Sequence, residues 1–147
     1  MSCIFHDKKR LPYSAEKLYQ VVADIESYPT FLPGCLAAKI LEQGTRYCRA
    51  SLTIGYGPFR ESYISKVLLT PSARVEVIYE SGPFSYLRNH WNFHSISEEE
   101  TEVEFFIDFK FRSFFLQKAM EAVFFDGVKY VMTAFEDRVK AIDGHID

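Results

Sequence analysis

The feature that most constrains the fold is a long helical pattern near the C-terminal end of the chain. After Arg112, apolar residues recur with a helical period for about 30 residues, which corresponds to a helix of about 45 Å. One stripe of this helix comprises Met120, Phe124, Val128, Val131, Phe135, Val139 and Ile142, and it is widened by Phe125 and Met132. The stripe is wider than a surface helix needs, so a second layer of structure must cover it.

The covering layer is predicted to be a β-sheet. Between Cys35 and Phe111, apolar residues alternate with polar ones, which is typical of strands with one buried face. The alternation runs through the segments 46–56, 60–70, 74–80, 86–94 and 101–111, and Ile64 and Leu68 weaken it in the second of these. The links between these segments are short and contain Gly, Pro or Ser, so the strands are expected to form an antiparallel meander.

The N-terminal part is predicted to add a strand and two helices. Ser14 is a suitable N-cap for a first helix, whose apolar face comprises Leu18, Val21, Val22 and Ile25. Ser27 is expected to cap a second, short helical turn that ends before Pro33. The whole order predicts an α+β fold in which a curved antiparallel β-sheet wraps around a long C-terminal α-helix, with residues 1–147 in a single domain.

Aromatic residues make up 16% of the chain and include 14 Phe, which indicates either a very bulky core or an apolar cavity between sheet and helix. The inward positions include Tyr56, Tyr63, Tyr79, Trp91, Phe93, Phe105, Phe109, Phe124 and Phe135. Asn89 also faces inward, where its amide needs a hydrogen-bond partner from the protein or from the polar end of a ligand. Arg138 lies in the apolar arc of the long helix, and an ion pair with a carboxylate is expected for it. A hydrophobic-ligand carrier and a core without a ligand are both compatible with this pattern.

Other features exclude several classes of function. A net charge of -3 gives no general attraction to nucleic acid, so no DNA partner is expected. Three cysteines without CxxC spacing indicate reduced thiols, and His90 and His94 lie on the polar face of a strand, so no metal site is expected. Nucleotide-binding loops, serine-hydrolase motifs and apolar runs of about 18 residues are all missing from the sequence, which suits a soluble, non-enzymatic protein.

Four stretches resemble the coenzyme Q-binding proteins, a branch of the START-like (polyketide cyclase and lipid transport) superfamily. They are LPYSAEKLYQVVADIESYPTFLPGC, GPFSYLRNHWNF, VEFFIDFKFRSFF and FFDGVKYVMTAFEDRVKAIDG, which together extend along nearly the whole chain. The resemblance implies the helix-grip form of the fold predicted above. One departure is Gly34, where the family often has Trp, and we expect this change to open the cavity rim or to alter membrane contact.

The resemblance implies that the protein binds and delivers ubiquinone, or a related isoprenoid quinone or lipid, without catalysis, in support of respiration and ubiquinone biosynthesis. The implied protein carries no metal, no resident cofactor and no catalytic residue. The expected ligand-binding residues are Phe31, Leu32, Ile54, Tyr56, Tyr63, Asn89, Trp91, Phe93, Phe105, Phe109, Phe124, Val128, Val131 and Phe135. A ribosome-associating toxin of bacteria shares much of the pattern, so a ribosome-binding module on the same fold is the alternative function.

The resemblance also carries expectations about partners and place. We expect transient contact with a membrane surface, and a homodimer is a further possible assembly. The location would be the cytoplasm beside the inner membrane in a bacterium, or the matrix side of the inner membrane in a mitochondrion. The apolar connector DIESYPTFLPGC would place Tyr28, Phe31 and Leu32 near the cavity mouth, where they form either a lip that contacts ligand or membrane, or a plug that closes the end of the sheet.

Overall fold

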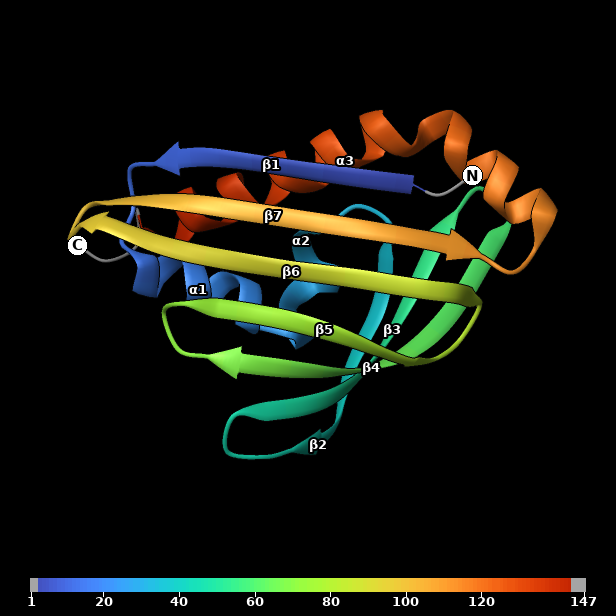
Figure 1. Cartoon of the computed structure of the whole chain (residues 1–147), viewed down its shortest axis with the longest axis horizontal. Coiled ribbons are helices and arrows are strands. Elements are labelled where there is room, and N and C mark those ends of the chain that lie inside the picture. Colours follow the sequence, from blue (N-terminus) through green and yellow to red (C-terminus); the bar gives the residue numbers. More distant parts are fainter. Residues whose placement is uncertain (1–2, 144–147) are drawn as a thin grey trace.

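The computed structural model describes residues 3–143 and shows a strongly curved sheet wrapped around a long C-terminal helix (Figure 1). This is the predicted α+β arrangement, and the predicted order of elements is confirmed. The elements are β1 (Cys3–Leu11), α1 (Ala15–Ala23), the 3-10 turn η1 (Ile25–Ser27), α2 (Tyr28–Phe31), β2 (Cys35–Gln43), β3 (Tyr47–Tyr56), β4 (Phe59–Thr70), β5 (Arg74–Ser81), β6 (Phe84–Ser97), β7 (Glu100–Phe111) and α3 (Phe114–Asp143).

The seven strands form one antiparallel sheet in the order β1-β7-β6-β5-β4-β3-β2. Consecutive strands from β2 to β7 are neighbours, as in a meander, and β1 joins the free edge of β7 with Cys3 opposite Phe109. The register shifts within the β2–β3 pair and again at Ile64 and Ser65 between β4 and β5. Such irregularities bend a sheet, and here they accompany the curvature that lets the sheet surround α3.

The concave face of the sheet and one face of α3 bury each other in a common core. From α3 the core takes Phe124, Val128, Phe135 and Val139, and α1 adds Leu18, Val21 and Val22. The sheet contributes its largest side chains, among them Trp91, Phe105 and Phe109. The alternating pattern of the strands and the helical stripe therefore meet in one hydrophobic layer.

The two helix caps differ in how well the sequence predicted them. The Ser14 hydroxyl accepts a hydrogen bond from the Lys17 backbone N–H at 3.2 Å, as expected for an N-cap. The prediction for Ser27 was wrong, because its side chain makes no capping hydrogen bond to α2. The Ser27 hydroxyl instead donates to the Asp24 carboxylate at 2.6 Å, which fastens η1 rather than α2.

Two expectations for α3 are also corrected. Phe125 does not widen the buried stripe, since 62% of its surface is exposed, while Met132 packs against the core as predicted. Arg138 forms no ion pair within residues 3–143; its guanidinium lies 5.3 Å from the centre of the Phe31 ring. A cation over an aromatic face satisfies this position without a carboxylate.

Candidate functional site

A cavity of about 530 Å³ lies between the concave face of the sheet and α3. Its volume falls within the range of about 300–1,000 Å³ that small-molecule sites occupy. The wall is built from inward positions of β3 to β7 and from α3, with a contribution from the α2–β2 connection. The lining residues are Ile25, Tyr28, Leu32, Pro33, Gly34, Cys35, Ala50, Leu52, Ile54, Gly55, Tyr56, Tyr63, Ser65, Val67, Val75, Val77, Phe84, Leu87, Asn89, Trp91, Phe105, Ile107, Phe109, Phe111, Met120, Val123, Phe124, Gly127, Val128, Tyr130, Val131 and Phe135.

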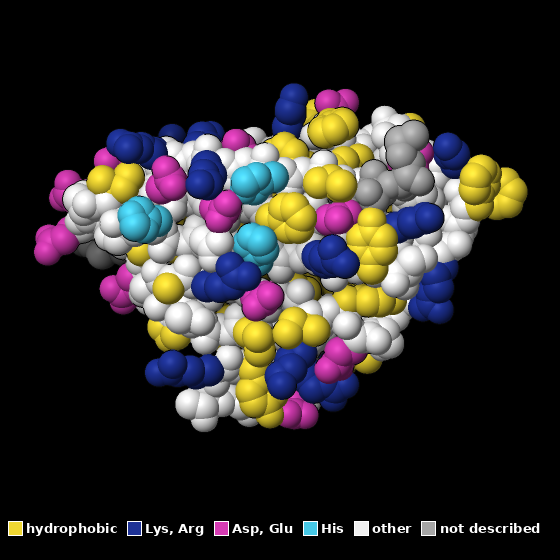
Figure 2. Space-filling view, viewed as in Figure 1, with side chains coloured by type: hydrophobic (Ala, Val, Ile, Leu, Met, Phe, Trp, Pro, Cys, Tyr) yellow, Lys and Arg dark blue, Asp and Glu magenta, His cyan; other side chains and the backbone are white. Residues whose placement is uncertain are grey.

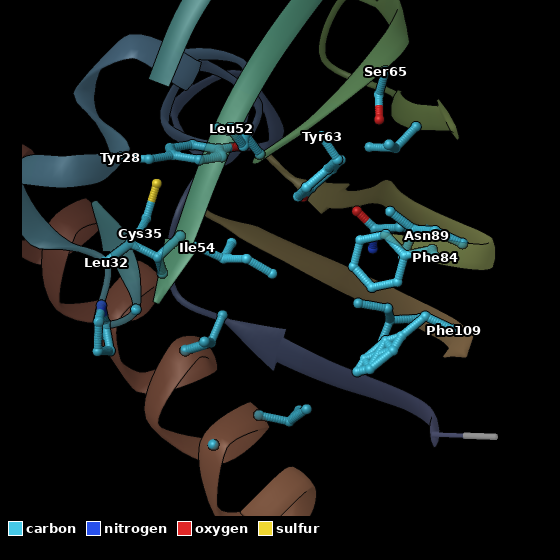
Figure 3. A pocket seen from close by; sticks show the side chains of 18 of the residues that line it. Tyr28, Leu32, Cys35, Leu52, Ile54, Tyr63, Ser65, Phe84, Asn89 and Phe109 are labelled. Carbon is cyan, nitrogen blue, oxygen red and sulfur yellow. The ribbon is translucent and has the colours of Figure 1, made fainter. Parts of the chain in front are cut away.

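A few polar groups interrupt this apolar wall, and three of them lie on the sheet side, away from α3 (Figure 3). The Asn89 Nδ2 donates to the Phe106 carbonyl oxygen at 2.9 Å, so the amide does have a protein partner. The Ser65 hydroxyl is buried and has no hydrogen-bond partner within residues 3–143. Burial raises the pKa of the Tyr63 hydroxyl, so this group is protonated at neutral pH.

The mouth of the cavity lies between the α2–β2 connection and α3. The exposed members of the lining are Pro33, Gly34, Tyr56, Gly127 and Tyr130, and they mark where the cavity meets solvent. Gly34 has a φ of +85°, and a Cβ atom added there would meet only the Gly55 carbonyl oxygen, at 3.6 Å. Gly34 is an exposed member of the cavity lining, so the departure from the family's usual Trp lies at the rim.

Residues of the apolar connector DIESYPTFLPGC, which precedes β2, pack against α3 or line the first cavity. Tyr28 and Phe31 form a cluster of perpendicular rings with Phe135, each ring 5.4 Å from Phe135, and the Tyr28 hydroxyl donates to the Val22 carbonyl oxygen. These contacts fix α2 on α3, which is the geometry of a plug. Tyr28 also lines the first cavity, as does Leu32, which lies next to the mouth (Figure 3).

A second cavity of about 520 Å³ lies beyond the first, among α1, α3, β1, β6 and β7. Its inner wall is apolar, and its rim carries charged residues such as Lys9 and Glu136, whose side chains form an ion pair at 2.7 Å. Trp91, Phe105 and Phe135 line both cavities and stand between them. The centre of the Trp91 ring lies 4.6 Å from that of Phe105 and 4.9 Å from that of Phe135, so Trp91 contacts both other rings in the wall that the two cavities share.

Most residues predicted to bind ligand lie in the first cavity. Its lining includes Leu32, Ile54, Tyr56, Tyr63, Asn89, Trp91, Phe105, Phe109, Phe124, Val128, Val131 and Phe135. Phe93 lies in the second cavity instead, and Phe31 lies outside both because its ring packs between Tyr28 and Phe135. Sequence reasoning missed Ser65, although its place between Tyr63 and Val67 on an alternating strand was enough to assign it an inward position.

The lining of the first cavity carries few polar side chains. Among the described residues its lining has no Asp, Glu, His, Lys or Arg. Burial raises the pKa of the Tyr28 hydroxyl and of the Cys35 thiol, so neither supplies an anionic nucleophile at neutral pH. Within residues 3–143 no three His, Cys, Asp or Glu side chains gather in a way that could hold a metal ion. No helix in this range is long and apolar enough to cross a bilayer.

A comparison of the sequence with known protein families adds to this description of the cavity. A family model described as polyketide cyclase / dehydrase and lipid transport matches residues 11–136. The chain belongs to this family. The matched region extends from Leu11, at the end of β1, to Glu136, in the C-terminal half of α3. It therefore includes every element that lines the first cavity.

The chain is also similar to several named proteins. The ribosome association toxin RatA of Rickettsia prowazekii is 37% identical, over 94% of this chain and 97% of its own length. RatA of Escherichia coli is 33% identical, over 90% of this chain and 84% of its own length. The mitochondrial coenzyme Q-binding protein COQ10 homolog B of Xenopus laevis is 32% identical, over 95% of this chain and 59% of its own length.

Solved structures share this fold. A START superfamily protein from Mycobacterium smegmatis matches with a TM-score of 0.79 and 15% identity, over 95% of this chain and 98% of that one. The Zhui aromatase/cyclase from Streptomyces matches with a TM-score of 0.81 and 17% identity, over 95% and 94% of the two chains. These likenesses concern the fold alone, and they show that the fold also serves enzymes.

Proposed function

We propose that this protein binds an isoprenoid quinone, such as ubiquinone, or a closely related lipid, and delivers it without chemical change. The observation that carries the proposal is the first cavity, an apolar space that opens at one mouth and has a few polar groups on one side. This combination suits a molecule with a small oxygenated head and a hydrocarbon tail. The coenzyme Q-binding relative and the lipid-transport family support the same class of ligand.

The physical need for such a carrier follows from the tail. Each methylene moved out of water contributes about 0.8 kcal/mol, so a polyprenyl tail does not leave a membrane unaided at a useful rate. A cavity of about 530 Å³ holds the headgroup and the first isoprene units. The remainder of a long tail would then lie at the mouth, against Tyr56 and Tyr130 or against a membrane.

We also propose that the protein does not change its ligand chemically. This part of the proposal rests on the side chains that line the first cavity. General acid–base catalysis needs a group whose pKa lies near the working pH, within hydrogen-bonding reach of the substrate. The lining described above supplies only neutral hydroxyl, thiol and amide groups. These groups can orient a ligand, and they favour binding over the cyclase chemistry of some structural neighbours.

Transient contact with a membrane surface is the expected route of exchange. Phe114, Phe115, Phe125 and Tyr130 of α3 are each more than 60% exposed, and the last lies at the mouth of the cavity. Figure 2 shows hydrophobic side chains protruding at the end of the molecule where α3 begins. Exposed aromatic rings of this kind partition into the interfacial region of a bilayer, which favours a location beside an inner membrane.

Extraction of the purified protein with organic solvent, followed by mass spectrometry of the extract, tests the proposal. We expect an isoprenoid quinone or a lipid of similar length in the extract, and saturable uptake of added ubiquinone by protein freed of lipid. Protein that yields no lipid and takes up no quinone would contradict the proposal.

Association with the ribosome is the second candidate function, and the names of the RatA relatives favour it. The outer face of the sheet in Figure 2 carries intermingled basic, acidic and histidine side chains rather than a continuous basic surface. Sedimentation of the protein with large ribosomal subunits, at several salt concentrations, tests this candidate. A specific complex that persists at physiological salt, combined with normal respiration after deletion of the gene, would favour it over quinone delivery.

A further inference from the structure

A buried hydroxyl without a partner is the least expected group in the first cavity. Ser65 lies in the middle of β4, and only 3% of its surface is exposed. Its neighbours along the inward face are Tyr63 and Val67, and its own oxygen has no hydrogen-bond partner within residues 3–143. Buried hydroxyl groups are normally hydrogen-bonded, because an unmade bond leaves the cost of desolvation uncompensated.

The surroundings of Ser65 are arranged so that a ligand can supply the missing bond. Figure 3 shows the Ser65 hydroxyl pointing into the cavity, with Tyr63 and Asn89 on the same side. The Asn89 amide is held by its 2.9 Å hydrogen bond to the Phe106 carbonyl oxygen, while its Oδ1 accepts no hydrogen bond from the described residues. The Tyr63 hydroxyl likewise makes no hydrogen bond within that range, and its ring is fixed against Tyr79 and Phe84.

We infer that Ser65 is the specificity-determining residue of the cavity, and that it donates a hydrogen bond to a carbonyl oxygen at the polar end of the bound isoprenoid. The inference rests on the proposed function and adds the group by which a quinone is distinguished from a hydrocarbon of the same shape. A serine hydroxyl can donate to a carbonyl, whereas the free Asn89 Oδ1 can only accept. Donation to a ring carbonyl is therefore a task for a hydroxyl and not for Asn89 Oδ1, and of the Ser65 and Tyr63 hydroxyls only that of Ser65 is a buried atom without a partner among the described residues.

This role has an unusual signature, because it separates stability from affinity. In the free protein, Ser65→Ala removes a buried polar group that has no partner, so the melting temperature of the variant should rise. In the complex, the same change removes a hydrogen bond to the ligand, so affinity for a quinone should fall about tenfold, which corresponds to about 1.4 kcal/mol. Affinity for a linear isoprenoid hydrocarbon without oxygen should stay the same.

Trp91 provides the measurement, since it is the only tryptophan of the chain and it lines the cavity. A short-tailed ubiquinone is titrated into lipid-free protein while quenching of Trp91 fluorescence is recorded. The hydrocarbon is then measured by its ability to displace the quinone and restore the fluorescence. Ser62→Ala is the matched control, because Ser62 lies on the same strand, is exposed, and bonds to Thr53 on the outer face at 2.8 Å. It should bind both compounds as the unaltered protein does.

Three results decide the matter. A selective loss of quinone affinity in Ser65→Ala, with a smaller loss in Ser65→Cys, whose thiol is a weaker donor of similar size, supports the role of Ser65. Unchanged quinone affinity, or equal losses for quinone and hydrocarbon, overturns it while leaving quinone binding itself intact. Failure of the unaltered protein to bind either compound overturns the proposed function, and the role of Ser65 falls with it.

Discussion

Replacement of Gly127 by alanine should make the protein more stable. This glycine lies in the interior of α3, and a Cβ atom built on it would meet no other atom within 4 Å. Glycine in the interior of a helix is less favourable than alanine by about 1 kcal/mol. With no clash to offset this gain, Gly127→Ala should raise the free energy of unfolding by about 1 kcal/mol and the melting temperature by about 2–4 °C.

Urea denaturation followed by circular dichroism measures this change directly. A shift of the midpoint to higher urea at constant slope is expected, because the exposed area on unfolding is nearly unchanged. An unchanged or lowered midpoint would refute the reasoning and would indicate that α3 needs the freedom of glycine at the cavity mouth.

A larger side chain at the same position tests the mouth itself. Gly127→Trp places an indole among the exposed lining residues, so uptake of a short-tailed quinone should slow at least several-fold. Ala122→Trp is the control, since Ala122 is exposed on α3 and lies outside the lining. Equal uptake rates in the two variants would show that ligand reaches the cavity by another route.

Three more predictions concern the frame around the site. Thr101 is completely buried and donates to a backbone carbonyl oxygen before α1 at 2.8 Å, so Thr101→Val should lower the free energy of unfolding by about 1–3 kcal/mol; a neutral result in urea denaturation would contradict this. Hydrogen bonds from Asn92 and from a β1 histidine hold the pKa of Glu104 below its usual 4.5, so its contribution to stability is complete above pH 4.5 and is lost as the pH falls through the lower folded value. In the Glu104→Gln variant, the free energy of unfolding should therefore fall less steeply as the pH is lowered in this range. An unchanged dependence on pH would refute the role of Glu104. Replacing Phe114 and Phe115 together by Ser should change unfolding by no more than about 0.5 kcal/mol but weaken sedimentation with vesicles of phosphatidylcholine and cardiolipin; unchanged sedimentation would exclude this end of α3 from membrane contact.

The elements of the fold were predictable because their hydrophobic periods are long and uninterrupted. The stripe from Met120 to Val139 fixed the position and direction of α3, and the alternation around Trp91 and Phe105 fixed the inward faces of β6 and β7. Caps were less predictable. Ser27 has the right residue type for a cap, but Asp24 competes for its hydroxyl, and only the folded chain brings the two together.

The sequence predicted which side chains face the interior, but it did not predict the boundaries of the cavity that they line. Alternation shows that Phe93 faces inward, yet it does not show that the wall of Trp91 and Phe105 separates it from the first cavity. Phe31 is apolar and close to the mouth, but its ring is taken up by contacts to α3 that depend on how α2 docks. Ser65 was missed because a single polar residue at an inward position interrupts the alternation of apolar and polar residues. Its role as a lining residue becomes evident only in the folded chain.

The wall formed by Trp91, Phe105 and Phe135 also determines the order in which a ligand is released. These rings stand between the first cavity and the second, so a ligand that uses the mouth of the first cavity would enter and leave on the same side, and whatever enters last would leave first. A quinone whose carbonyl is held at Ser65 has its tail toward the mouth. It would therefore return to a membrane tail first, and the headgroup would let go only after the tail had dissolved in lipid. The hydrocarbon tail then stays out of water at each step of the transfer from the cavity to the membrane. The transfer therefore needs no external source of energy.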